Sequence, residues 1–220
     1  MESNAVEITV AGQGSAAFPP ERCTVALQVR SDGRSAEAAA EPAHRLVGEL
    51  AQLIEPLYNS EHGPIDAWSL DQVRHSRQRP SNQNGEQLPY VYRAIASIAV
   101  EFAQIDVIDA FVYAVTALDG VDIGHFEWAL TADSAAEKTR YVRTLAVQDA
   151  VEKAEVFAHS VGRAAITALG VADPGLLGVG NAAPDFSASA RAYLGADDGF
   201  ELRPQNITLH AEVHARFAAT

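Results

Sequence analysis

The chain has 220 residues, 48% of them hydrophobic, and a formal net charge of −13. This length and composition are enough for a sizeable core, and we expect a single domain spanning residues 1–220. The excess of acidic residues disfavours binding to nucleic acid or to an anionic membrane surface, because like charges repel at long range. No stretch approaches the roughly 18 apolar residues of a membrane-spanning helix.

The single cysteine and the first residues bear on the cellular compartment. Cys23 has no second cysteine with which to form an intrachain disulfide. It lies on the apolar side of an alternating segment, which predicts a small buried thiol of low reactivity; dimerisation through this thiol is the alternative. Residues 1–12 have no basic start and no apolar run of signal-peptide length. We therefore expect a cytoplasmic protein.

Alternating apolar and polar residues predict strands at the start of the chain. They cover residues 5–11 and 22–30, and the connection between them is rich in glycine and proline. Residues 35–58 predict a helix, because leucines recur there at spacings of three and four. Pro42 either begins this helix or separates it from a shorter helix before it.

The middle of the chain predicts a hairpin followed by a helix and a strand. Residues 65–77 and 90–103 form the arms of the hairpin, with a turn at Asn84-Gly85. Residues 106–118 follow as a short helix that Asp106 can cap. A strand at 121–131 changes its apolar parity at Gly124, which predicts a β-bulge.

The last third predicts a long helix and a final strand. Ser134 and Glu137 have the spacing of a capping box, so we expect a helix from there to Val161, ended by Gly162. A short strand over 165–171 follows. Residues 172–204 show little periodicity and predict a long loop, a mobile arm, an oligomer contact or strands that the pattern hides. Residues 207–217 alternate without a break, as a half-buried strand does.

From Arg22 onward the predicted order is strand, helix, strand, strand, helix, strand. This is the order of a ferredoxin-like βαββαβ core, an antiparallel sheet with both helices on one face. The long third helix and the C-terminal strand are additions to that core. The fold class is therefore α+β.

Several of these segments together resemble the SIMPL domain, a bacterial family of unknown function related to periplasmic immunogenic proteins. A glycine pair follows the opening strand, Pro204 precedes the terminal strand, and Pro19-Pro20-Glu21 stands where the family tends to have Pro-Asp. The glycine pair and the third-helix pattern that carry the resemblance are Gly12, Gly14, Arg143, Ala146, Ala150, Lys153-Ala154, Ala158 and Gly162.

The resemblance implies an α+β fold and a tendency to form homo-oligomers. Some periplasmic members resemble large ring-like or channel-like assemblies. Familiar members carry a secretion signal, so the periplasmic role usually supposed for them does not transfer directly to this chain. The family contributes no catalytic residues and no cofactor.

Histidines on the polar side of the last strand are candidate metal ligands. His210, Glu212 and His214 alternate along it, and alternate residues of a strand lie about 6.5–7 Å apart. Such residues can share one metal ion if a neighbouring strand supplies a further ligand. His125 and Glu127 have the same spacing in another strand. A solvated polar face is the alternative interpretation.

Arginines gather around the two arms of the predicted hairpin. Arg74, Arg77, Arg79 and Arg93, with His75 beside them, form a local positive cluster in an acidic chain. Such a cluster suits an anion or the acidic surface of a neighbouring subunit. Cross-strand pairing with Asp71 and Glu101 is the alternative.

The sequence contains no convincing enzyme motif. Gly175–Asn181 lacks the flanking strand, the helix and the lysine of a phosphate-binding loop, and no nucleophile elbow is present. Our leading hypothesis is a non-enzymatic, homo-oligomeric scaffold or binding module that needs no cofactor. A metal-binding protein or metal-dependent enzyme that uses the histidines of the last strand is the first alternative, and a sensor of small anions is the second.

Overall fold

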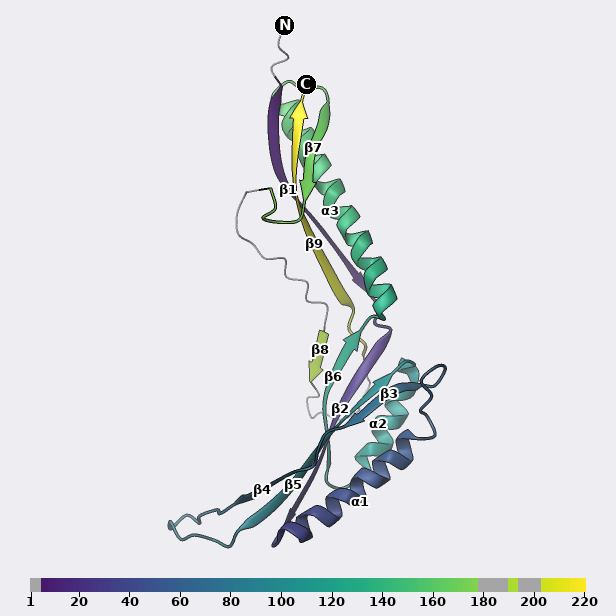
Figure 1. Cartoon of the computed structure of the whole chain (residues 1–220), viewed down its shortest axis with the longest axis vertical. Helices are drawn as coiled ribbons and strands as arrows, with labels where there is room; N and C mark the ends of the chain where they lie inside the picture. The colour runs from purple at the N-terminus through teal and green to yellow at the C-terminus, as the bar shows by residue number, and fades with distance from the viewer. Residues whose placement is uncertain (1–4, 178–189, 194–202) are drawn as a thin grey trace. The chain divides into compact units, whose positions relative to one another are not determined.

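The computed structural model describes residues 5–177, 190–193 and 203–220, and these form three α-helices and two antiparallel sheets (Figure 1). The predicted α+β class is confirmed. Residue contacts divide the chain into two compact units. The first comprises Met1–Pro19, Leu130–Ala188 and Asn206–Thr220, and the second comprises Pro20–Ala129 and Ser189–Gln205. Within the described part of the chain, no helix is long and apolar enough to cross a membrane.

The second unit contains the ferredoxin-like arrangement predicted from the sequence. Its main strands lie in the order β3-β5-β2-β6, and each pairs antiparallel with its neighbour. Helices α1 and α2 cover one face of this sheet (Figure 1). The strands are β2 (Arg22–Gly33), β3 (Ile65–Leu70), β5 (Val91–Phe102) and β6 (Val121–Ala129), and the helices are α1 (Ala36–Ile54) and α2 (Ile108–Thr116).

Two shorter strands extend this sheet. The predicted strand over 65–77 is divided into β3 and a separate strand, β4 (Arg74–Gln78), and both pair with β5. The backbone of β8 (Ala190–Tyr193) pairs with the outer side of β6. The bulge predicted at Gly124 is confirmed, since Gly124 and His125 together oppose the single residue Ala26.

Helix α1 starts where the sequence predicted it, with Ser35 as its cap, whereas the predicted cap of α2 is wrong. Helix α1 runs from Ala36 through Pro42 without a break, because the Ser35 Oγ accepts a hydrogen bond from the Ala38 N–H (3.1 Å) and fixes the start there. Asp106 does not cap α2. It lies inside a 3-10 turn, η1 (Ile105–Val107), that leads into the helix without a side-chain cap.

The core of this unit lies between the sheet and its two helices. Alternate residues of β2 point into it, and Cys23 among them is fully buried with a free thiol. Burial raises the pKa of the Cys23 thiol to about 12. The predicted burial of this thiol is therefore confirmed, and its low reactivity stays a prediction. The largest buried side chains here include Leu27, Leu50, Ile54, Phe102, Phe126 and Trp128.

The first unit is a three-stranded sheet covered by one long helix. Strands β1 (Val6–Phe18), β9 (Ile207–Ala219) and β7 (Ile166–Ala172) lie in the order β1-β9-β7, so the two ends of the chain pair with each other. Helix α3 (Ala132–Ser160) packs on β1 and β9 (Figure 1). It buries alanines at every fourth position, namely Ala146, Ala150, Ala154 and Ala158.

The glycine pair was predicted to lie in a turn, and this prediction is wrong. Strand β1 continues through Gly12 and Gly14 to Phe18. A Cβ added at Gly12 would collide with the Ala146 carbonyl oxygen and lie 2.7 Å from the Ala150 Cβ. The glycines are therefore needed because α3 approaches the backbone of β1 closely.

The predicted capping box at Ser134 is also wrong. Helix α3 begins at Ala132, and the Thr131 Oγ1 accepts the hydrogen bond from the Ser134 N–H (3.3 Å). Gly162 ends the helix as predicted, with a positive φ of 71°. The strand predicted over 165–171 is confirmed as β7. Most of the predicted 172–204 arm lies outside the described residues.

Candidate functional site

The predicted histidine row lies on the face of the first unit's sheet that α3 does not cover. Residues of β9 with the opposite parity face α3 and are buried, from Ile207 to Ala219. His210, Glu212 and His214 pair in register with Ser15, Gln13 and Ala11 of β1. The alternation predicted from the sequence therefore places these three side chains on one face.

Only two members of the row contact each other. The His214 Nε2 lies 3.2 Å from the Glu212 Oε1, and the buried His214 Nδ1 has no hydrogen-bond partner among the described residues. His125 belongs to β6, in the other unit. Within residues 5–177, 190–193 and 203–220, no group of three or more His, Cys, Asp or Glu side chains has a metal-binding arrangement.

The predicted arginine cluster is divided between two faces of the β4–β5 hairpin. Strand pairing sets Ser76 opposite Arg93 and Arg77 opposite Tyr92, so neighbouring residues of β4 point to opposite faces. Arg74 and Arg93 share the face that the helices leave open. Arg77 and Arg79 lie on the other face.

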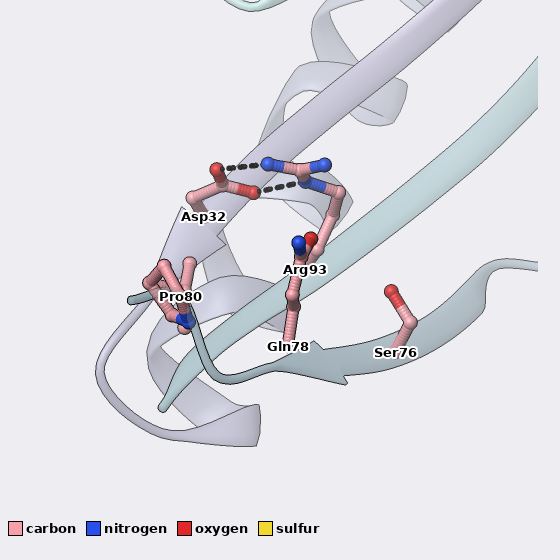
Figure 2. Close-up of a pocket in the computed structure, with 6 residues that line it drawn as sticks. Asp32, Ser76, Gln78, Pro80 and Arg93 are labelled. Atoms are coloured by element: carbon pink, nitrogen blue, oxygen red, sulfur yellow. Dashed lines mark hydrogen bonds and ion pairs between the residues drawn. The ribbon is translucent and has the colours of Figure 1, made fainter. Parts of the chain in front are cut away.

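On the open face, Arg93 forms an ion pair with Asp32. The Arg93 Nε and Nη2 donate to the two carboxylate oxygens of Asp32 at 2.7 and 2.8 Å, as Figure 2 shows. This side-chain hydrogen bond lowers the pKa of Asp32 below its usual value. The pair borders a hollow of about 210 Å³, lined also by Ser76, Gln78, Pro80 and Val91 (Figure 2). Arg93 is therefore neutralised within its own chain.

On the opposite face, two arginines stack on one tyrosine. The guanidinium carbons of Arg77 and Arg79 each lie 5.3 Å from the centre of the Tyr90 ring. This distance is within the range of cation–π attraction. The Arg79 Nε also donates to the Leu88 carbonyl oxygen (3.2 Å). These contacts hold both cationic groups beside an aromatic ring on an exposed ribbon.

A second hollow lies on the open face of the same sheet. It has a volume of about 360 Å³, and its floor consists of small residues at the centre of the sheet, including Ala26, Ala99 and Gly124. Polar side chains surround this floor, namely Gln28, Ser69, Asp71, Ser97 and His125.

The motif residues of α3 contact the edge of β1. β1 is the outer strand of its sheet, so one side of its backbone has no partner among the described strands. The Lys153 Nζ donates to the Ala11 carbonyl oxygen (3.0 Å) and to Asp149 Oδ2 (2.7 Å). The Gln13 N–H donates to the same Asp149 oxygen (2.7 Å). Lys153 and Asp149 therefore occupy backbone groups to which another strand would bind.

Other parts of the motif have structural roles too. Its alanines form the buried stripe of α3, its glycine ends the helix, and Arg143 lies 3.6 Å from Asp173, just beyond β7. Sequence reasoning missed Asp149, although its i,i+4 spacing with Lys153 indicated a helical ion pair. The motif therefore specifies how α3 is seated on the sheet.

A comparison with protein-family models identifies the family of this chain. The model of the SIMPL family, described as a protein of unknown function (DUF541), matches residues 8–217. The chain belongs to the SIMPL family. A comparison with curated proteins gives no match. The SIMPL match covers segments of both compact units.

Proposed function

We propose that this SIMPL-domain protein is a non-enzymatic scaffold or binding module that acts as a homo-oligomer. The observation that carries the proposal is the exposed hairpin with Arg77, Arg79 and Tyr90 on one face. Arginine and tyrosine are enriched at the energetically important positions of protein interfaces. A structured cationic surface in a chain of net charge −13 is complementary to an acidic protein surface.

The experiment is the absolute mass of untagged protein in solution, measured by light scattering behind a sizing column. We expect a defined species of at least two chains, with a mass that stays constant over a tenfold dilution series above the dissociation constant. A strictly monomeric protein at high concentration that also retains no partner would contradict the proposal.

Metal binding by the last strand is the second candidate. It is favoured by the contact between Glu212 and His214 and by the His214 Nδ1, a buried nitrogen for which the described part of the chain supplies no hydrogen-bond partner. A metal at this site would need a further ligand, and His210 is the nearest predicted one on the strand. Elemental analysis of untagged protein tests this candidate, with His214→Ala as the control. No stoichiometric metal, and melting unchanged by chelation, would remove it.

A further inference from the structure

Hydrogen bonds link the residues at the tip of the β4–β5 hairpin. The Asn82 Oδ1 accepts hydrogen bonds from the N–H groups of Asn84 (3.0 Å) and Glu86 (2.9 Å), and its side-chain nitrogen donates to the Glu86 carboxylate (2.8 Å). The Leu88 N–H donates to the Pro80 carbonyl oxygen (2.8 Å). A surface ordered before binding loses little conformational entropy when it binds.

The hairpin also extends beyond the rest of its sheet. β2 ends at Gly33, which pairs with Tyr92, so the segments just before and after the turn pair with no other described strand (Figure 1). Tyr90 is 44% exposed and Leu88 41%. Within the described part of the chain, Arg74, Arg77 and Arg79 form no ion pair. We name the surface formed by Arg77, Arg79 and Tyr90 on one face the basic hairpin.

Charge is strongly segregated along this unit. Residues 72–93 carry four arginines and one acidic residue, Glu86. Residues 94–129 carry six acidic residues and neither lysine nor arginine. The segment that follows the hairpin directly is therefore its electrostatic complement.

Part of this acidic segment forms an exposed stripe on α2 and the turn before it. Asp106, Asp109 and Tyr113 recur at spacings of three and four, so they lie on one side of the helix, and all three are exposed. Tyr113 is 81% exposed. The opposite side buries Ile108, Phe111, Val112 and Val115. We name Asp106, Asp109 and Tyr113 the acidic α2 face.

We propose that the basic hairpin of one copy docks on the acidic α2 face of a second copy. The proposal rests on the homo-oligomer proposed above and names the two surfaces that meet. Arginines that already lie beside Tyr90 can pair with the carboxylates of Asp106 and Asp109, and Tyr113 supplies a second ring for stacking. A second copy is the chosen partner because its α2 carries the complementary charge.

The two surfaces differ, so each copy presents one basic hairpin and one acidic α2 face. Such a heterologous contact leaves a free hairpin at one end and a free α2 at the other. It therefore repeats until it closes into a ring, or it continues as a filament. The contact consists of solvent-exposed charges, so it weakens as salt is raised.

The test uses charge reversal on each surface of the full chain. We expect Arg77→Glu/Arg79→Glu, and separately Asp106→Arg/Asp109→Arg, to reduce the assembly to smaller species in light scattering, with an apparent Kd at least tenfold higher. A one-to-one mixture of the two variants restores complementary pairs and is expected to recover the assembly. The control Arg45→Glu/Arg140→Glu makes the same charge change at exposed residues of α1 and α3 and is expected to leave the mass unchanged.

Asp106→Arg/Asp109→Arg also removes two carboxylates that interact favourably with the N-terminal end of α2, so this variant can lose stability as well as binding. Tyr113→Ala tests the same surface without changing that end of the helix. This exposed tyrosine has no packing role, so the variant is expected to keep the wild-type circular dichroism spectrum while the apparent Kd rises severalfold. A mixture of the two charge-reversed variants that stays dissociated would overturn the proposal.

Other outcomes separate this proposal from the proposed function. An assembly whose mass survives Arg77→Glu/Arg79→Glu overturns the hairpin contact and leaves the homo-oligomer standing. A monomeric wild-type chain overturns both. A hairpin variant that keeps its mass but loses binding of a fluorescent single-stranded oligonucleotide would show that the arginines serve nucleic acid instead, which also overturns the proposal.

Discussion

Gly12 and Gly14 set the distance between β1 and α3. A Cβ at Gly14 would collide with the Val142 carbonyl oxygen and lie 2.7 Å from the Ala146 nitrogen. These neighbours are helix backbone atoms, which cannot move aside as a flexible side chain can. The helix therefore packs on the glycine backbone itself, which explains why alanine recurs on its buried side.

Replacing Gly12 with alanine is expected to destabilise the protein by about 2–3 kcal/mol, because the new methyl group overpacks a backbone contact. Gly48 is the matched control. It lies in α1 with no atom within 4 Å of an added Cβ, so Gly48→Ala is expected to stabilise the protein by about 0.5–1 kcal/mol. Urea unfolding of both variants measures the difference. Equal effects at the two positions would refute this packing account.

Asp149 links the stability of the first unit to pH. Hydrogen bonds from Lys153 and from the Gln13 N–H lower the pKa of the Asp149 carboxyl below its usual value. A carboxyl with a lowered folded-state pKa contributes stability that is present above its unfolded pKa, about 4, and is lost as pH falls through the folded pKa.

Asp149→Asn is therefore expected to be less stable than the wild type at pH 6. The difference should shrink steadily below pH 4, where the wild-type carboxyl becomes protonated. Denaturant unfolding at intervals from pH 6 to pH 2.5 measures it, with Asp133→Asn as a control for an aspartate with no ion pair to lysine or arginine in the described residues. A difference independent of pH would mean that the carboxylate charge plays no part.

At the scale of elements, the start of α3 tests the corrected cap. Thr131→Ala removes the hydroxyl that accepts from the Ser134 N–H and is expected to cost about 1 kcal/mol. Ser134→Ala lies one turn inside the helix and is expected to change stability by less than about 0.5 kcal/mol. Thermal or urea unfolding distinguishes the two. The reverse order of effects would restore the capping box that the sequence suggested.

Local patterns predicted most elements and the order of the ferredoxin-like core. Leucine spacing located α1, alternation located β2 and β9, and the change of parity at Gly124 located the bulge. These features depend on residues near one another in sequence. The pairing of β1 with β9 joins the two ends of the chain, and periodicity within a strand does not identify its partner.

The errors arose where one residue type has two structural uses. Glycine suits a turn and also a close helix contact, so Gly12 and Gly14 were assigned to a connection. The arginines were predicted to act together, but register places Arg77 and Arg93 on opposite faces. The spacing of Asp106, Asp109 and Tyr113 in the sequence is enough to place Tyr113 on a polar side of α2. The stacking of Tyr90 on two arginines depends on strand register, which the sequence pattern does not give.

At the scale of the whole molecule, neither unit is a continuous segment. The chain passes from one unit to the other four times, and β1 and β9 bring both termini into the same sheet. The first unit therefore forms only when segments on either side of residues 20–129 come together. This interleaving is compatible with a single domain. The single domain expected from the length stays a prediction.

Differential scanning calorimetry tests that prediction. We expect one thermal transition whose calorimetric and van't Hoff enthalpies agree, because the interleaved segments make the two units depend on each other. Gly12→Ala should lower the temperature of that single transition. Two separate transitions, of which Gly12→Ala shifts only one, would show that the units unfold independently.

The central claim is that this SIMPL-domain protein acts as an assembly of its own chains. The most direct measurement is the absolute mass of the untagged wild-type protein, by light scattering behind a sizing column at low and high salt. The account predicts a defined multiple of the 23.4 kDa chain at low salt and dissociation towards that mass at high salt. A single species of one chain under both conditions, at the highest concentration that can be prepared, would contradict it.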